Sequence, residues 1–92
     1  MDTNAHISIR YCRLCNWMMR SAWMAQELLA AFSDDIEKLT LIPDTGGVFE
    51  IKIDDTLIWS RTVEHGFPSI KELKQRTRDH LSPDRDLGHT DR

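Results

Sequence analysis

The chain opens with a short segment in which apolar and polar residues alternate. Ile7, Ile9 and Tyr11 fall on one side of an extended backbone, and the residues between them are polar or charged. A period of two is typical of a strand with one buried face. We therefore expect a strand over residues 6–11.

From residue 16 to residue 32 the hydrophobic period changes to that of a helix. The predicted apolar stripe consists of Met18, Ala22, Ala25, Leu29 and Phe32. Spacings of three and four residues place these side chains on one helix face. Methionine fills irregular gaps in a core, so we expect Met19 and Met24 there as well. Trp23 and Trp59 are expected to pack in the core or on a face of the sheet.

Three further strands are predicted in the middle of the chain. They cover residues 36–42, 49–53 and 56–61, where apolar and polar residues again alternate. The segment 43–47 (PDTGG) is rich in turn-forming residues. Asp54 and Asp55 offer a two-residue hairpin turn between the last two strands.

A second helix is predicted to follow Ser69. Ser69 and Glu72 have the spacing of a capping box, in which the two side chains satisfy free amides of the first helical turn. The helix should reach about His80. The side chains expected to face inward are Ile70, Leu73 and Thr77.

These elements predict one α/β domain over residues 1–81, in the order β-α-β-β-β-α. A helix joins the first two strands, so these strands should run parallel with a right-handed crossover. Short turns join the last three strands, which should run antiparallel. The expected architecture is a two-layer sandwich, a four-stranded mixed sheet with two helices, in the outline of a thioredoxin-like fold. The charged residues 82–92 are expected to form a loosely docked tail.

Charge and hydropathy argue against two classes of function, nucleic-acid binding and membrane association. The 92 residues carry a net charge of -3, which argues against binding to nucleic acid. A basic cluster in the second helix (Lys71, Lys74, Arg76 and Arg78) alternates with acidic residues, as on a solvated helix face. No apolar window approaches the ~20 residues of a membrane span, and residues 1–6 do not resemble a signal peptide. We therefore expect a cytoplasmic protein without a membrane association.

The two cysteines, Cys12 and Cys15, lie where the first strand gives way to the first helix. In the cytoplasm, a close cysteine pair is more often catalytic or metal-binding than structural. Its position favours thiol–disulfide exchange, because the helix N-terminus and the flanking Arg10 and Arg13 would stabilise a thiolate. A structural zinc half-site and inert thiols are the alternatives, although zinc usually takes four ligands and no second Cys-x-x-Cys exists. We expect no metal and no cofactor.

Besides Arg13, three positions are candidate contacts for a partner thiol. Gly46 and Gly47 allow the backbone of a partner to approach closely before the third strand, although an ordinary turn would also explain them. Trp17 would offer a flat apolar anchor if it were exposed. The Trp17 surface or an exposed edge of the third strand could support a homo-oligomer.

Five segments, in order along the chain, carry a family resemblance. They are residues 11–17 (YCRLCNW), 46–51 (GGVFEI), 57–61 (LIWSR), 66–68 (GFP) and 87–91 (LGHTD). Together they resemble the selenoprotein W-related (Rdx) family, in a cysteine-containing form of bacterial type. The resemblance implies a thioredoxin-like fold, thiol-based redox activity, and glutathione or protein thiols and disulfides as partners.

The resemblance also concerns the order in which the two sulfurs act. Thioredoxin chemistry would make Cys12 the attacking thiolate and Cys15 the resolving one. In selenium-containing members of the family, selenocysteine stands at the position of Cys15, which implies the opposite order. A thiol reduces peroxides more slowly than a selenol, which argues against a peroxide-reducing role here. The chain also has Arg13 and Leu14 where those members carry smaller residues.

The sequence therefore predicts a thiol–disulfide oxidoreductase in which Cys12 and Cys15 cycle between dithiol and disulfide. The alternative is a redox-controlled interaction module without turnover. In that module, the disulfide would change a binding surface near Trp17 and Phe67.

Overall fold

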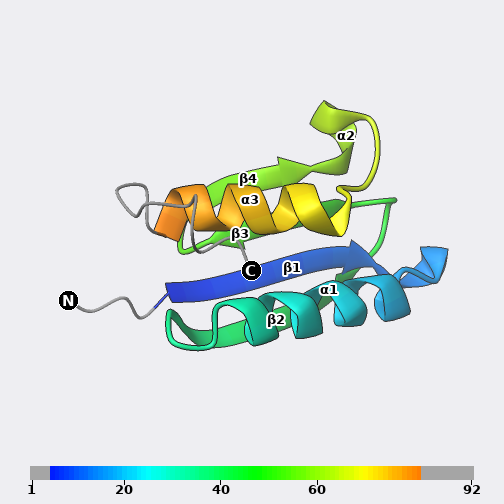
Figure 1. The fold of residues 1–92 in the computed structure, drawn as a ribbon. Coiled ribbons are helices and arrows are strands. Elements are labelled where there is room, and N and C mark those ends of the chain that lie inside the picture. The colour runs from blue at the N-terminus through cyan, green and yellow to red at the C-terminus, as the bar shows by residue number, and fades with distance from the viewer. Residues whose placement is uncertain (1–4, 82–92) are drawn as a thin grey trace.

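The computed structural model describes residues 5–81, which form one sheet with helices (Figure 1). The strands are β1 (Ala5–Cys12), β2 (Ile36–Asp44), β3 (Phe49–Ile53) and β4 (Thr56–Ser60). The helices are a 3₁₀ turn η1 (Arg13–Cys15), α1 (Met18–Ala31), α2 (Arg61–Glu64) and α3 (Ile70–Leu81). The predicted tail, residues 82–92, lies outside the described residues.

The sheet has the strand order β2-β1-β3-β4. β1 pairs in parallel with β2 and antiparallel with β3, and β3 pairs antiparallel with β4. The predicted strand directions are thus confirmed, but β2 and β3 are not neighbours because β1 lies between them. The prediction of an exposed third-strand edge is wrong, because β3 is paired on both sides and β2 and β4 form the edges.

One face of the sheet is covered by α1 and α3, which lie side by side in front of the strands in Figure 1. On this face Ile7, Ile9 and Tyr11 of β1 are buried, as the alternation predicted. Ile51 is buried beside Ile9, its partner in the β1–β3 ladder. The predicted two-layer arrangement is confirmed, and the hydrophobic core lies between the layers.

The buried face of α1 differs from the predicted stripe. Its buried residues are Ser21, Met24, Ala25 and Leu28, and Phe32 is buried at the C-cap. The prediction of burial is therefore correct for Ala25 and Phe32. It is wrong for Met18, which is 49% exposed, and for Leu29, which is 41% exposed. The prediction is also wrong for Met19 and Trp23, which are exposed, and correct for Met24 and Trp59. Apolar side chains occur around much of this helix, so its period alone does not select one face.

The polar residue Ser21 is buried on α1 because its hydroxyl is satisfied within the helix. It donates to the carbonyl of Trp17, four residues earlier, at 2.8 Å. A buried hydroxyl that is hydrogen-bonded costs little. This local bond allows the smaller residue to face the sheet while the apolar Met18 and Met19 face solvent.

A short helix missed by the sequence analysis follows β4. The fourth strand ends at Ser60 rather than at residue 61. The helix α2 is a single turn that ends at Glu64, and its C-cap His65 has a left-handed backbone at φ 64°. Four residues are too few to show a helical period, which is why the turn was missed. The fold therefore has this helix in addition to the two predicted ones.

The start of α3 agrees with the prediction. The Ser69 hydroxyl accepts a hydrogen bond from the backbone amide of Glu72 at 3.1 Å, which is half of a capping box. Leu73 and Thr77 are buried and Ile70 is partly buried, as expected. No helix within residues 5–81 is long and apolar enough to span a membrane.

Arg76 connects three elements and is not part of a solvated basic face as predicted. Its guanidinium donates to the Ile58 carbonyl of β4 at 3.0 Å and to the Glu64 carboxylate of α2 at 2.9 Å. It also donates to Glu72 at 3.1 Å and lies 4.5 Å from the Trp59 ring centroid. The hydrogen bond from Arg76 holds the pKa of Glu64 below its ordinary value.

This contact predicts how the stability of the fold depends on pH. Because the pKa of Glu64 is lowered in the folded state, its stabilising contribution is present above the ordinary carboxylate pKa and is lost as the pH falls through the folded pKa. Glu64→Gln should lower the urea midpoint of unfolding at neutral pH. The midpoint of this variant should also fall less on acidification than that of the wild type. The measurement is urea unfolding of both proteins between neutral and strongly acidic pH.

Glu50→Gln supplies a control that removes a carboxylate from β3 without touching Arg76. A difference between the wild type and Glu64→Gln that stays constant down to acidic pH would contradict the role given to this ion pair.

Candidate functional site

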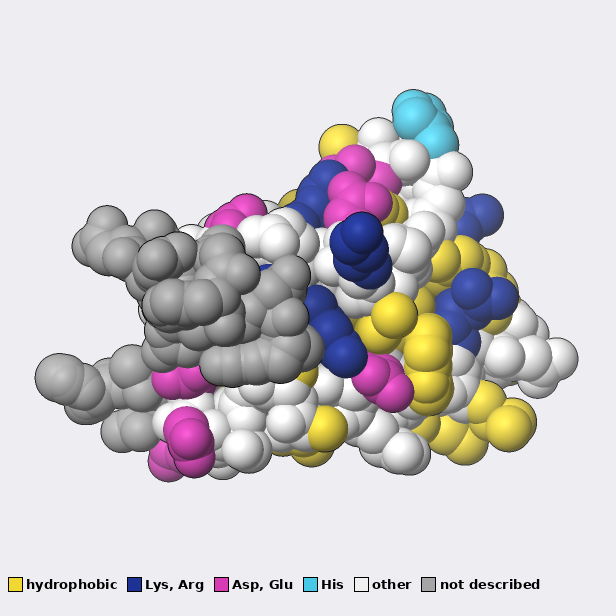
Figure 2. All heavy atoms as spheres, viewed as in Figure 1, with side chains coloured by type: hydrophobic (Ala, Val, Ile, Leu, Met, Phe, Trp, Pro, Cys, Tyr) yellow, Lys and Arg dark blue, Asp and Glu magenta, His cyan; other side chains and the backbone are white. Residues whose placement is uncertain are grey.

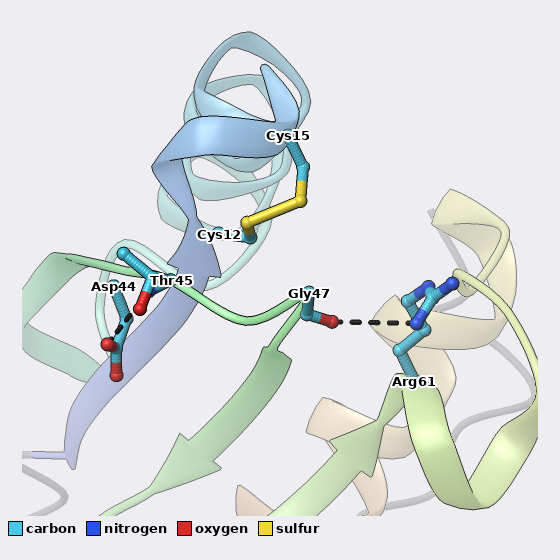
Figure 3. Close-up of a disulfide and its surroundings, with 6 residues drawn as sticks. All are labelled: Cys12, Cys15, Asp44, Thr45, Gly47 and Arg61. Carbon is cyan, nitrogen blue, oxygen red and sulfur yellow. Dashed lines mark hydrogen bonds between the residues drawn. A yellow bond between two sulfur atoms is a disulfide. The ribbon is translucent and has the colours of Figure 1, made fainter.

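The two cysteines meet at the C-terminal end of β1. Cys12 is the last residue of the strand, Cys15 ends η1, and their sulfurs form a disulfide (Figure 3). The Cα atoms are 5.3 Å apart, within the usual separation for such a bond. Asn16 adopts a left-handed backbone at φ 63°, so the chain turns before α1 begins at Met18.

The expectation that the N-terminus of the long helix lies at the cysteine pair is therefore wrong. Cys12 precedes the three-residue turn η1, and α1 starts only after Asn16 and Trp17. A helix dipole acts within its first turn, so α1 offers Cys12 less positive potential than predicted. The local charges near the pair become correspondingly more important.

The two sulfur-bearing residues differ in their exposure. Cys12 is 1% exposed, because it is held at the end of the central strand beside Asp44 of β2. Cys15 is partly exposed, and the residues between the cysteines, Arg13 and Leu14, face solvent. A partner molecule therefore reaches the Cys15 side of the disulfide more readily.

Asp44 occupies the flank of the site and binds Arg10. One of its carboxylate oxygens accepts a hydrogen bond from the Thr45 amide at 2.8 Å, and the other lies 3.0 Å from the Arg10 guanidinium. The Thr45 amide, and after it Arg10, lowers the pKa of Asp44. Arg10 was expected to stabilise a thiolate, but its charge is largely compensated by this carboxylate.

The loop before β3 runs past the disulfide. Gly46 and Gly47 both have positive φ, at 80° and 72°, which favours glycine at these positions. A Cβ atom added at either residue would meet nothing within 4 Å, so the space beside the loop is open. Figure 3 shows Gly47 between the disulfide and Arg61, and the Gly47 carbonyl accepts a hydrogen bond from Arg61 at 3.5 Å.

Trp17, two residues after Cys15, belongs to an aromatic cluster. The rings of Trp17 and Phe67 meet edge to face with centroids 4.9 Å apart, and Phe49 contacts Phe67 at the same separation. The guanidinium carbon of Arg61 lies 5.0 Å from the Trp17 ring centroid, and that of Arg20 lies 4.2 Å from the Phe67 ring centroid. Trp17 is thus partly buried under Arg61 and is not the flat exposed anchor considered above.

The exposed apolar groups near the pair are instead Leu14, Met18 and Met19, which are 68%, 49% and 78% exposed. They extend from η1 into the first turn of α1. Figure 2 shows hydrophobic side chains together with Lys and Arg at this end of the molecule. This surface begins at Leu14, between the two cysteines, and continues into α1.

All the site residues predicted from the sequence lie around the end of β1: Cys12, Cys15, Arg13, Trp17, Gly46 and Gly47. Arg20 and Arg61 were not among them. Arg61 was taken as the end of a strand, and no local pattern signals its contacts with Trp17 and Gly47. Within residues 5–81, no three His, Cys, Asp or Glu side chains are grouped as metal ligands would be.

Comparison with known proteins agrees with this arrangement. The sequence profile of the Rdx family matches residues 6–79. A crystal structure of a selenoprotein W-related protein from Vibrio cholerae is 57% identical with a TM-score of 0.84, and the match covers 86% of this chain and 99% of that one.

A crystal structure of a protein from Bordetella parapertussis is 51% identical with a TM-score of 0.83, and the match covers 85% of this chain and 99% of that one. No curated protein matches the chain. The resemblance noted from the sequence is confirmed, and so is the thioredoxin-like α/β fold. The protein belongs to the Rdx family.

Proposed function

We propose that the protein is a thiol–disulfide oxidoreductase that exchanges electrons with glutathione or protein thiols in the cytoplasm. The observation that carries this proposal is the Cys12–Cys15 disulfide, closed across a 3₁₀ turn with one residue buried and the other partly exposed. Membership of a redox-related family supports it. The single bond between two side chains stores and releases two electrons without a cofactor.

In the proposed reaction, Cys15 makes contact with the partner. The Cys15 thiolate attacks one sulfur of a partner disulfide, forms a mixed disulfide and releases one partner thiolate. The Cys12 thiolate then attacks the Cys15 sulfur, closes the intramolecular disulfide and releases the second partner thiolate. The partner disulfide gains two electrons, the dithiol loses two, and both released thiolates take up protons from solvent. Two glutathione thiols return the protein to the dithiol by the reverse exchange, forming glutathione disulfide.

The burial of Cys12 favours this order over that of thioredoxin. A buried sulfur cannot be reached by a bulky disulfide, but it is well placed to attack a neighbouring sulfur in the same chain. The intramolecular step gains from the enforced proximity of the two side chains. Arg13, between the cysteines, adds positive charge that favours the thiolate form.

Cysteine-to-serine variants test the order of attack. Reduced Cys12→Ser should accumulate a mixed disulfide with glutathione at Cys15, because the resolving sulfur is gone. Reduced Cys15→Ser should react with glutathione disulfide more than about tenfold more slowly than Cys12→Ser, which corresponds to ~1.4 kcal/mol of activation free energy. Intact-protein mass spectrometry over time measures both. Equal rates, or faster reaction of Cys15→Ser, would reverse the proposed order.

The loop at Gly46 and Gly47 is proposed to align the backbone of a peptide partner beside Cys15. The open space over both glycines and their position beside the disulfide support this role. Such an approach requires the absence of side chains, because a Cβ would occupy the space that a partner backbone uses.

Gly47→Asn tests the docking role without demanding an unfavourable backbone, because Asn tolerates a left-handed conformation. Exchange with a peptide disulfide should slow several-fold, while exchange with the small hydroxyethyl disulfide should keep its wild-type rate. Stopped-flow measurements of both substrates give the comparison. Asp54→Asn is a matched control, because Asp54 also has positive φ, at 55°, and lies in the distant β3–β4 turn. Equal slowing of both substrates by Gly47→Asn would rule out a docking role.

A second candidate function is a redox-controlled interaction module. The exposed Leu14, Met18 and Met19 beside the disulfide favour it, because an apolar surface of this kind suits a protein partner. In such a module, the disulfide changes the surface once and no catalytic cycle follows.

Turnover separates the two candidate functions. With glutathione, glutathione reductase and NADPH, an oxidoreductase should consume many equivalents of hydroxyethyl disulfide per molecule of protein. An interaction module should consume about one equivalent of oxidant and then stop. Absorbance of NADPH measures the difference, and the Cys12→Ser/Cys15→Ser double variant gives the background. Consumption that ends after one equivalent would exclude the oxidoreductase in favour of the module.

A further inference from the structure

Charge is distributed unevenly along the central strand. The β3–β4 turn and the turn that follows α1 lie beside the start of β1, since Ala5 donates to the Asp35 carbonyl and Asp54 donates to the His6 carbonyl. These two turns carry four carboxylates, Asp34, Asp35, Asp54 and Asp55. The disulfide is at the other end of the strand. Eight residues of strand span roughly 23 Å. This is well beyond the Debye length of about 8 Å at physiological ionic strength, so the acidic end does not neutralise the end that carries the dithiol.

The dithiol end is rich in arginine. Asp44 binds Arg10 at 3.0 Å and compensates its charge, and Glu50 is the partner of Arg10 in the β1–β3 ladder. Arg20 and Arg61 form no ion pair with a carboxylate within residues 5–81. Among the described residues, no carboxylate therefore compensates Arg20 or Arg61, and the same holds for Arg13 between the cysteines.

Arg20 and Arg61, called here the arginine pair, are held by rings and not by acids. Arg61 lies over Trp17, Arg20 lies over Phe67, and the two rings contact each other. A guanidinium stacked on a ring keeps most of its N–H donors at its edge, where they can form a bidentate contact with a carboxylate. The contact with the ring also restricts the side chain before any ligand arrives, which lowers the entropic cost of binding.

Arg61 also borders an open pocket. Together with Thr62, His65 and Gly66 it lines a volume of about 350 Å³. This is at the lower end of the sizes typical of small-ligand sites, which begin at about 300 Å³. A hydroxyl, an imidazole and a guanidinium around one hollow suit a carboxylate. In Figure 3, Arg61 and the disulfide lie on opposite sides of Gly47, so a ligand that contacts both would cross the open glycine loop.

We propose that Arg61, assisted by Arg20, binds carboxylates of the thiol partner and makes the protein selective for anionic peptide thiols and disulfides. The inference rests on the proposed function for its biological meaning, but the binding itself needs no electron transfer. Its ligand is a small peptide with a carboxylate a few bonds from its sulfur. Neutral and cationic disulfides lack the group that the arginine pair recognises.

Binding is tested with S-methylglutathione, which keeps both carboxylates and cannot exchange. The oxidised wild-type protein should show saturable ¹⁵N–¹H shift changes at the Trp17 indole and at the Gly47 and Gly66 amides. The dissociation constant should rise with added salt. Arg61→Gln should weaken binding about tenfold, as expected for the loss of a charge-assisted bidentate contact. Arg20→Gln should weaken it less, and Arg61→Lys should restore only part of the affinity because the planar fork is missing.

Lys52→Gln is the matched control, because it removes one positive charge from an exposed residue of β3 away from the arginine pair. It should leave the dissociation constant unchanged. The ¹⁵N–¹H spectra of all variants also report whether each is folded. If Arg61→Gln were unfolded, Arg20→Gln and Arg61→Lys would decide the question. Absence of saturable shifts in the wild type, or equal weakening by Lys52→Gln, would overturn the proposal.

The reduced protein gives a second test. The wild type should react faster with glutathione disulfide than with the cationic cystamine, and Arg61→Gln should lose about tenfold of this preference. Equal loss of rate with both disulfides would overturn a role in recognition, since Arg61 would then act on the thiolate alone. If the protein exchanged with neither disulfide, the proposed function would fail, whereas S-methylglutathione titration would still decide whether the carboxylate site exists.

Discussion

β1 is hydrogen-bonded along both of its edges, and the register of these two ladders determines where the cysteine pair lies. A shift of one residue would turn Ile7, Ile9 and Tyr11 away from the helices and would carry Cys12 to the other side of the sheet. Burying a large apolar side chain contributes about 1.5–3 kcal/mol, so three such residues strongly favour one register. The buried position of Cys12 therefore follows from the packing of the whole sheet. The turn that joins it to Cys15 does not determine it.

This constraint leaves the two sulfurs in different surroundings. Cys12 is fixed by the strand and shielded from solvent, whereas Cys15 lies at the end of a short 3₁₀ turn and is partly exposed. In the proposed mechanism, the exposed sulfur meets partners and the shielded one closes the ring. This division of roles does not need a long helix that begins directly at the cysteine pair and stabilises a thiolate there.

Arginine residues illustrate how the same side chain acquires different roles in one small domain. Arg76 is surrounded by the carboxylates of Glu64 and Glu72 and connects α3 to α2 and β4. Arg10 is compensated by Asp44. Arg20 and Arg61 lie over the rings of Phe67 and Trp17, and Arg61 also donates to the Gly47 carbonyl. The first two guanidiniums contact carboxylates of the fold, and the last two are proposed to bind those of a ligand.

Local patterns in the sequence determined much of this protein. The alternation in β1, the turn at Asp54 and Asp55, the cap at Ser69 and the Cys-x-x-Cys depend on residues within a few positions of each other, and each was predicted. Together with the segments that resemble the Rdx family, they established the fold class and drew attention to Cys12 and Cys15. The predicted redox chemistry remains a proposal that rests on these same residues.

Only the tertiary structure decided which face of α1 is buried, that β1 separates β2 from β3, and which arginines are compensated. Apolar residues on several sides of α1 allow more than one face to pack, and the selection depends on the sheet that the helix meets. The contact of Arg61 with Gly47 joins residues 14 positions apart, and that of Arg20 with Phe67 joins residues 47 positions apart. No periodicity or short motif encodes such contacts, because they form only when distant segments are brought together by the burial of a common core.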